Sequence, residues 1–171
     1  GPLDEGRGVV VALPHSGNWD HAAAFFLGKG YKAATVAEHL KPERVFQAFL
    51  KYRKDLGLEV FSTDMRTVPT LIKRAKEGFI IALVADRDLS SHGVEVDFFD
   101  GIAKMPAGPA VIAEKAGVDL IGAFITYTST SIKIVFEKLD YSVQAEATFF
   151  EREMRKNPVD WHMLQRIWVN D

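Results

Sequence analysis

The chain has 171 residues, of which 47% are hydrophobic and 26% charged, a composition that fits one globular domain over residues 1–171. The absence of cysteine excludes disulfides, thiolate metal sites and thiol nucleophiles. The formal net charge of −2 gives no general attraction to nucleic acid, and no apolar run approaches the length of a membrane span, so we expect no nucleic-acid partner and at most a surface contact with membrane.

Along the chain, short apolar and β-branched runs alternate with stretches of helical spacing. The predicted elements are strand 8–14, helix 18–29, strand 33–37, helix 42–56, strand 58–61, helix 67–77, strand 79–84, strand 94–99, helix 106–116, strands 120–125 and 132–136, and helical sequence over 145–169. Within the last stretch, the aromatic-rich residues 161–168 favour a helix docked on the core over an interfacial helix. The alternation predicts an α/β/α sandwich with a mainly parallel central sheet, helices on both faces and antiparallel strands late in the chain.

A histidine follows the first predicted strand, and a carboxylate lies five residues later. His15 is on the loop and Asp20 is in the first turn of the next helix, which allows Asp20 to fold back toward His15. A carboxylate holds a histidine in one tautomer and stabilises its imidazolium, as a general base acting on an alcohol requires. A simple helix cap at Asp20 is the alternative. Ser16 is a less favoured nucleophile, because adjacent residues on a turn are poorly placed for a Ser–His hydrogen bond.

Ionisable residues also follow the second and fourth predicted strands. Glu38 and His39 come after the second strand, and Asp86 and Arg87 come after the fourth. Because the carboxyl ends of parallel strands meet at one edge of a sheet, we expect these groups to converge with His15. Asp86 directly follows an apolar strand and should be poorly solvated. It is therefore a second candidate to orient His15 or to bind a substrate, with an ordinary loop aspartate as the alternative.

An arginine falls on the apolar stripe of the helix predicted over residues 42–56. Arg53 continues the spacing of Phe46, Phe49 and Leu50. A cation on a buried face needs a partner, since an unpaired buried charge is costly. Either Glu38 or a bound phosphate would serve, and a purely structural arginine–glutamate pair remains open.

Two apolar features are further candidates for a binding site. Phe98 and Phe99 are adjacent in a predicted strand and should point to opposite faces, so that one is core and the other lines a pocket. Met105 precedes a helix of small residues over 106–116, which permits close approach of another element or of an acyl chain.

Four motifs in order resemble the phosphatidylinositol mannoside acyltransferases, which belong with the lipid A biosynthesis acyltransferases in the larger lysophospholipid acyltransferase group. The motifs span residues 15–20, 85–89, 96–99 with 105–110, and 160–165. The resemblance implies transfer of a long acyl chain from acyl-CoA, as co-substrate, to a mannose hydroxyl of a phosphatidylinositol mannoside. It implies a peripheral protein at the cytoplasmic face of the inner membrane, with no metal and no cofactor.

The resemblance also implies roles for individual residues. His15 and Asp20 take the places of the family's His-x4-Asp pair, and Asp86 falls where the family carries a glutamate, so the carboxylate that partners His15 stays open. Glu38 and Arg53 fall on acceptor-side positions. The remaining substrate-binding candidates are Arg87, Phe98, Phe99 and Met105. The stretch 62–69 looks shorter than the family's loop and the family's N-terminal helical region is absent, so we expect a catalytic core.

Three other functions fit parts of the pattern. The acceptor could be another lipid, such as a lysophospholipid or a lipid A precursor. The polar strand ends could hold a lipid headgroup without chemistry, as in a binding module. A metal-dependent hydrolase could use His15, Asp20, His39 and Asp86 as ligands.

Overall fold

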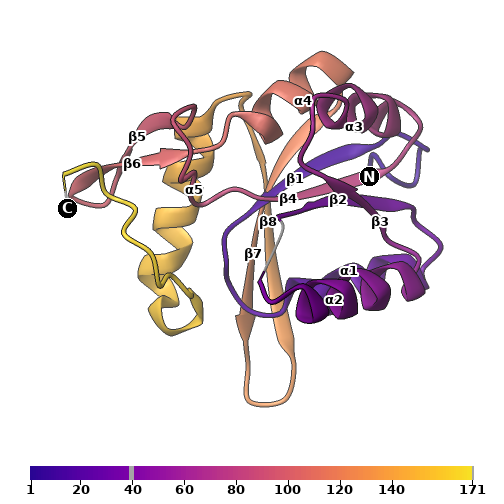
Figure 1. The fold of residues 1–171 in the computed structure, drawn as a ribbon, viewed down its shortest axis with the longest axis horizontal. Helices are drawn as coiled ribbons and strands as arrows, with labels where there is room; N and C mark the ends of the chain where they lie inside the picture. The colour runs from indigo at the N-terminus through magenta and orange to yellow at the C-terminus, as the bar shows by residue number, and fades with distance from the viewer. Residues whose placement is uncertain (39–40, 171) are drawn as a thin grey trace.

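A six-stranded sheet forms the centre of the chain, whose computed structural model describes residues 1–38 and 41–170 (Figure 1). Its strands are β1 (Val9–Leu13), β2 (Ala33–Ala37), β3 (Glu59–Ser62), β4 (Ile80–Val84), β7 (Asp119–Tyr127) and β8 (Ile132–Leu139). The strand order is β3-β2-β4-β1-β7-β8. All neighbouring pairs are parallel except β7 and β8, which confirms the prediction of a mainly parallel sheet with an antiparallel strand late in the chain.

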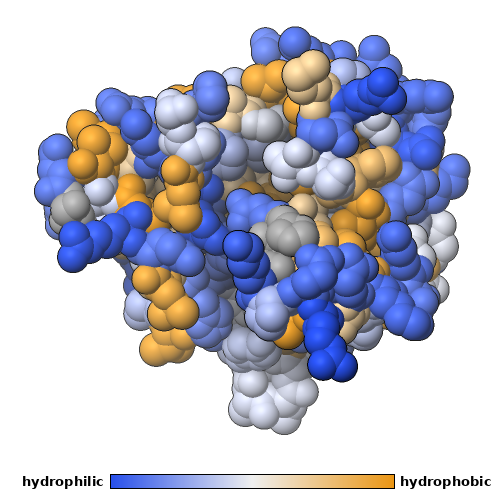
Figure 2. Space-filling model, viewed as in Figure 1, coloured by the Kyte–Doolittle hydropathy of each residue, from blue (hydrophilic) through white to orange (hydrophobic). Residues whose placement is uncertain are grey.

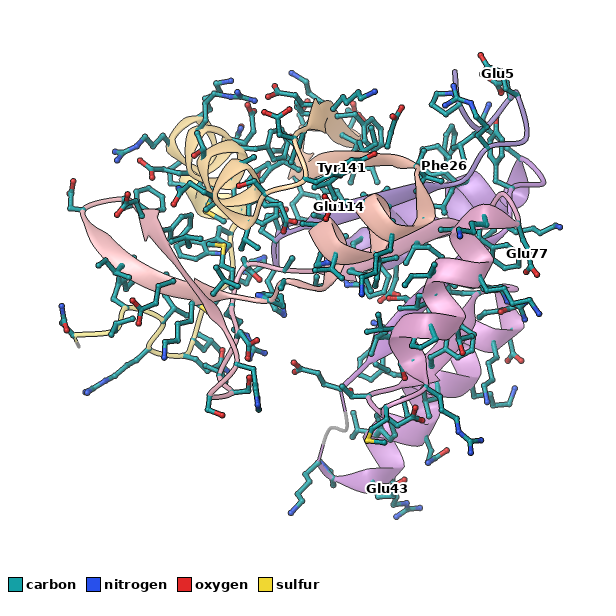
Figure 3. All side chains as sticks on the ribbon, turned by 90° about the horizontal axis from the view of Figure 1, so that it is seen from above. Glu5, Phe26, Glu43, Glu77, Glu114 and Tyr141 are labelled. Atoms are coloured by element: carbon teal, nitrogen blue, oxygen red, sulfur yellow. The ribbon has the colours of Figure 1, made fainter. Side chains whose placement is uncertain are left out.

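Helices cover both faces of this sheet. They are α1 (Trp19–Gly28), α2 (Glu43–Asp55), α3 (Thr67–Lys76), α4 (Gly108–Ala116) and α5 (Val143–Lys156). Figure 1 shows α1 and α2 on one face and α3 and α4 on the other, with α5 beside β7. In the view from above, Glu43 marks the start of α2 and Glu77 marks the residue after α3 (Figure 3). The predicted fold class, an α/β/α sandwich, is confirmed.

The central strands are apolar on both sides because both sides are covered. Val10, Ile81 and Leu120 have no exposed surface, and they belong to the large core cluster that α3, α4 and α5 complete. On the opposite face Val9 and Ile80 pack with Trp19 of α1 in a smaller cluster. Continuous apolar runs are typical of parallel strands buried in this way.

A β-hairpin beside the main sheet was only half predicted. β5 (Val94–Phe98) pairs antiparallel with β6 (Gly101–Met105), and the tight turn between them holds Phe99 at a positive φ of 53°. We predicted the first strand but not the second. The run from Gly101 to Met105 contains one β-branched residue and a glycine, so its sequence gives little indication of a strand.

The helical expectation for the C-terminal region is wrong beyond residue 156. α5 ends at Lys156, and a single 3-10 turn (Pro158–Asp160) follows. The next ten residues, 161–170, form no helix and are called the C-terminal strap below. Proline lacks a backbone N–H and disfavours helical geometry in the residue before it, so Asn157-Pro158 stops the helix despite the apolar spacing beyond it.

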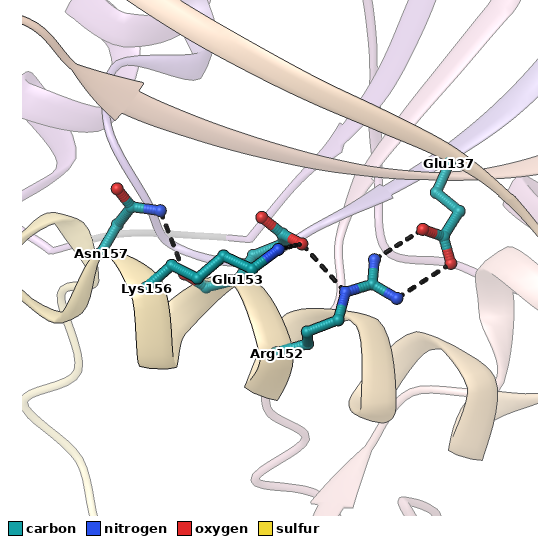
Figure 4. A network of polar contacts seen from close by, with 5 residues as sticks. All are labelled: Glu137, Arg152, Glu153, Lys156 and Asn157. Atoms are coloured by element: carbon teal, nitrogen blue, oxygen red, sulfur yellow. Dashed lines mark hydrogen bonds and ion pairs between the residues drawn. The ribbon is translucent and has the colours of Figure 1, made fainter.

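Charged residues attach α5 to β8 (Figure 4). Arg152 donates to Glu137 of β8 through Nη2 at 2.6 Å and to Glu153 through Nε at 3.0 Å. Lys156 donates to the same Glu153 oxygen at 2.9 Å. Burial acts to raise the pKa of Glu153, but the hydrogen bonds from Lys156 and Arg152 outweigh it and lower that pKa below its usual value. Glu153 is therefore a buried anion whose charge two cations balance.

The surface is mixed in character. On the face in Figure 2, hydrophobic residues lie in separate groups among hydrophilic ones, including at the left over β5, β6 and the C-terminal end. Among residues 1–38 and 41–170, no helix has both the length and the apolar character needed to cross a bilayer.

Candidate active site

The loop between β1 and α1 is fixed by close contacts with its neighbours. Gly17 has a φ of +54°, and a Cβ there would lie 2.6 Å from Cγ2 and 2.8 Å from the carbonyl oxygen of Ile125 in β7. A glycine meets both constraints at once. Asn18 then caps α1, because its Oδ1 accepts from the backbone N–H of His21 at 3.0 Å. The loop that carries His15 is thus pinned to β7 on one side and to α1 on the other.

His15 and Asp86 form a direct contact at the carboxyl edge of the sheet. Nδ1 of His15 lies 2.6 Å from Oδ1 of Asp86, and the backbone N–H of His15 donates to Oδ2 at 2.9 Å. The register of the two parallel strands explains this contact. Leu13 of β1 pairs with Val84 of β4, and two further steps along each strand reach His15 and Asp86.

A tryptophan from the C-terminal strap completes the group. Nε1 of Trp161 donates to Oδ2 of Asp86 at 2.9 Å. An ionised carboxylate can only accept hydrogen bonds, so with Asp86 ionised the proton of the imidazole lies on Nδ1. The lone pair of His15 is then on Nε2, the tautomer that a general base needs.

The two members of this pair, His15 and Asp86, differ in burial. Asp86 has no exposed surface, whereas 37% of the His15 side chain is exposed. The exposed part of the pair is therefore the imidazole, which a substrate can reach. An imidazole that is oriented by a buried carboxylate and open on its other side can accept a proton from a hydroxyl group.

Asp20 does not fold back to His15 as its partner. It binds Arg53 of α2, with Nε to Oδ1 at 2.8 Å and Nη2 to Oδ2 at 3.3 Å. The guanidinium also lies 4.4 Å from the ring centre of Trp19. Of the two carboxylates left open as partners of His15, Asp86 rather than Asp20 contacts it, and within the chain Arg53 pairs with Asp20 rather than with Glu38. The physical reason is that α2 packs beside α1 and brings Arg53 to the first turn of α1.

Glu38 lies instead near Arg87, at the carboxyl ends of the neighbouring strands β2 and β4. Their closest atoms are 3.7 Å apart, and the Glu38 side chain is 72% exposed, so this ion pair is weak. The predicted convergence of charged groups at this edge therefore joins Glu38 with Arg87 and His15 with Asp86. His39, the other residue predicted for this edge, lies outside the described residues.

The expectation that Phe98 and Phe99 point to opposite faces of one strand is wrong, because β5 ends at Phe98 and the two rings meet edge-on with centres 4.7 Å apart. Phe98 and Met105 have no exposed surface and belong to the main core. Phe99 is partly exposed and stacks on Trp161, with ring centres 6.2 Å apart. Of the three, Phe99 alone offers surface to a ligand in this conformation. Substrate contact by any of them stays a prediction.

Ser16 is not placed as a nucleophile. It is 1% exposed, and its Oγ accepts from the backbone N–H of Ile125 at 3.3 Å. The serine faces β7 rather than the open side of His15.

Within the described ranges, no group of three or more His, Asp or Glu side chains could hold a metal ion. The residues considered as metal ligands of a hydrolase do not point to a shared metal site in the described part of the chain. Asp20 is held by Arg53, Asp86 is enclosed by the strap, and His39 lies beyond the described residues.

Trp161 of the strap is a contact of the candidate site that the sequence did not predict. The motif over residues 160–165 drew attention to the segment, but the predicted helix gave no reason to bring its indole to the loop after β4. The strap reaches the site by pairing with the loop after β1, where the N–H of His162 donates to the carbonyl of His15 at 2.8 Å.

Comparison with known proteins gives a consistent result. The family model described as bacterial lipid A biosynthesis acyltransferase matches residues 2–170. The chain is 40% identical to the phosphatidylinositol mannoside acyltransferase of Mycolicibacterium smegmatis over 99% of this chain and 59% of that protein. It is 38% identical to the protein of the same name from Mycobacterium tuberculosis, over 99% of this chain and 57% of that protein. The chain thus spans less than two thirds of these relatives.

Proposed function

We propose that this chain, which belongs to the bacterial lipid A biosynthesis acyltransferase family, carries the catalytic centre of a membrane-surface enzyme. The reaction is transfer of a long acyl chain from acyl-CoA to a mannose hydroxyl of a phosphatidylinositol mannoside. The names of the two mycobacterial relatives support this acceptor. The cytoplasmic face of the inner membrane is the proposed location, as the resemblance of the four motifs implies.

The contact between His15 and Asp86 carries the proposal. Nε2 of His15 removes the proton from the sugar hydroxyl while the hydroxyl oxygen attacks the thioester carbonyl. The resulting tetrahedral intermediate collapses with cleavage of the C–S bond, and the departing thiolate takes the proton from the imidazolium. The products are an ester and free CoA. Asp86, 2.6 Å from Nδ1, fixes the tautomer and stabilises the imidazolium that forms.

Direct transfer is preferred to a covalent acyl-serine intermediate. Ser16 is buried and bound to β7, so its Oγ is not available to a thioester at the open side of His15. We expect Ser16→Ala to keep near-native turnover of acyl-CoA and glycolipid, and a rate reduced a thousandfold with an intact fold would argue for the covalent route.

The decisive experiment compares His15→Ala with His21→Ala, an exposed histidine on α1. Purified chain is incubated with a long-chain acyl-CoA and phosphatidylinositol mannoside, and both CoA release and acylated lipid are measured. We expect His15→Ala to lower kcat by about 10²- to 10⁴-fold, the usual contribution of a general base, and His21→Ala to leave it unchanged. Product formation by His15→Ala at the native rate would refute the role of His15.

The same assay separates the alternatives. CoA release by the native chain without acylated mannoside would point to another acceptor, such as a lysophospholipid or a lipid A precursor. Tight binding of the glycolipid with no CoA release would favour a binding module without chemistry.

A further inference from the structure

A cationic cavity lies beside the candidate active site and takes no part in the proposed proton transfer. It has a volume of about 280 Å³ and is formed by the loop after β4, by β6 and by the C-terminal strap. Each of these segments contributes one cation, namely Arg87, Lys104 and Arg166. Trp168 of the strap forms part of its apolar wall.

The charges of this cavity are not balanced within the described part of the chain. Lys104 and Arg166 have no ion-pair or hydrogen-bond partner there for their side chains. Arg87 has the weak contact with exposed Glu38 at 3.7 Å. Asp88 is the one acidic residue that lines the cavity, and its Oδ1 already accepts from the N–H of Ser90 at 2.8 Å. Three cations therefore face one carboxylate, which favours an anionic ligand.

The cavity is joined to the catalytic pair through the backbone and through aromatic rings. Arg87 directly follows Asp86 in sequence. Trp168 stacks on Phe98 with ring centres 6.4 Å apart, Phe98 contacts Trp161 edge-on at 6.0 Å, and Trp161 donates to Asp86. The N–H of Asp88 also donates to the carbonyl of Lys104 at 2.7 Å, which fixes the loop after β4 to β6.

We propose that this cavity binds a phosphate group of one of the two substrates, and the proposal rests on the proposed function. Lysine and arginine side chains are the usual partners of phosphate oxygens, and arginine can bind two of them at once. In acyl-CoA the pantetheine arm separates the pyrophosphate from the thioester. In the glycolipid the inositol ring separates the phosphodiester from mannose. In either substrate the phosphate is separated from the reacting atoms, so it should lie beside His15 rather than at it. The cavity lies in such a position.

Calorimetric titration with inorganic pyrophosphate tests the site without turnover. The variants are Lys104→Gln, Arg166→Gln and the double variant, with Lys76→Gln as control. Lys76 ends α3 just before β4 begins, so it lies toward the opposite edge of the sheet. We expect pyrophosphate to bind the native chain and the control equally, each single variant to bind about tenfold more weakly, and the double variant weaker still.

Absence of pyrophosphate binding to the native chain, or equal binding by a folded double variant, would overturn the proposal. Thermal unfolding of every variant establishes that the fold is kept. A native chain that binds pyrophosphate in this cavity yet transfers no acyl group would refute the proposed function and leave the phosphate site standing.

Two further titrations identify the source of the phosphate. Coenzyme A represents the donor, and glycerophosphoinositol represents the phosphodiester of the acceptor. A loss of CoA affinity confined to the cavity variants assigns the site to the donor, and a loss of glycerophosphoinositol affinity assigns it to the acceptor. If the double variant binds both as the native chain does, the cavity serves neither substrate and the proposal fails.

Discussion

Asp86 is surrounded by three donors from two separate parts of the chain. The carboxylate contacts the ring and the backbone of His15 and accepts from the indole of Trp161. Since Asp86 is fully buried, these groups replace the water that a carboxylate would otherwise bind. Trp161 contacts no reacting atom in this scheme, so its role would be to position Asp86 and, through it, His15.

Trp161→Phe tests this positioning role because phenylalanine keeps the aromatic packing and removes the N–H. We expect kcat to fall about tenfold, the usual effect of losing a hydrogen bond to a charged group. Because Trp161 contacts the base and not the substrate in this scheme, KM should stay near the native value. Steady-state kinetics at a fixed pH measure both parameters.

Trp168→Phe is the matched comparison for that loss of kcat. It removes an indole N–H from the same strap, but this one donates to the carbonyl of Phe98 at 3.2 Å. We expect its kcat to stay near the native value. An equal loss of kcat in both variants would mean that Trp161 acts through the packing of the strap alone.

Glu146 of α5 is a buried acid with a different character. It has no exposed surface, and neither carboxyl oxygen has a hydrogen-bond partner among the described residues. Burial raises the pKa of Glu146 from 4.5 to about 8, and the backbone N–H of Ala110 is near enough to oppose that rise only in part. Below pH 8 the folded chain therefore keeps this residue protonated, whereas the unfolded chain ionises it above pH 4.5.

Relative to the native chain, Glu146→Gln should therefore stabilise the fold more at high pH than at low pH. In the native chain, Glu146 is protonated below pH 4.5 in both the folded and the unfolded state. Between pH 4.5 and about 8 the unfolded state is favoured increasingly, because Glu146 ionises there and stays protonated in the fold. We expect the difference in unfolding free energy, variant minus native, to rise by about 1.4 kcal/mol per pH unit across that window. Urea denaturation at several pH values measures it. A pH-independent difference would contradict the assignment.

At the scale of elements, the contact between α5 and β8 depends on charge. Glu153 is held as an anion by Arg152 and Lys156, and these hydrogen bonds keep its pKa low although burial opposes them. A lowered pKa in the folded state means that the stabilisation is present above the unfolded value of 4.5. It is lost as pH falls through the folded value.

Glu153→Gln should destabilise the fold by about 2 kcal/mol at pH 7, because it leaves two cations without their buried partner. The difference should shrink as pH falls below 4.5, where the native residue also loses its charge. Glu137→Gln is the control within the same network (Figure 4). Its side chain is 45% exposed, so we expect less than about 1 kcal/mol. Equal effects in the two variants, by chemical denaturation, would count against a special role for Glu153.

At the scale of the whole molecule, the site is assembled from a rigid sheet and a lightly held strap. β1 lies between β4 and β7 and hydrogen-bonds to both. The strap has isolated pairings instead, such as the N–H of Val169 to Ile102 and the N–H of His162 to His15. Segments with few backbone hydrogen bonds open at lower free energy than central strands.

Hydrogen exchange under native conditions should therefore distinguish the two regions. We expect the amides of Val10 and Val11 to exchange only through global unfolding, and those of His162 and Val169 to exchange through local opening of the strap. Added denaturant should accelerate the strap amides less steeply, because less surface becomes exposed. Strap amides as protected as those of β1 would show that strap and sheet open together.

The local sequence was sufficient for most of the fold because burial leaves a pattern in each segment. Apolar runs such as 79–84 had to become covered strands, and the helical spacing between them had to supply the cover. The edge of the site followed from the same argument, since loops after parallel strands share one edge. The hairpin strand β6 and the strap left no such pattern. Gly101–Met105 has a single β-branched residue, and 161–168 has helical spacing but no helix.

By itself, then, the sequence determined the fold class, the loop that carries His15 and the set of carboxylates available to it, because these depend on local patterns. Only the tertiary structure decided that Asp86 meets His15 while Asp20 binds Arg53. That choice depends on strand order, which sets β4 directly beside β1 although 71 residues separate the two side chains. The position of Trp161 was decided in the same way, since the path of an irregular strap follows from its distant contacts and not from its own residues.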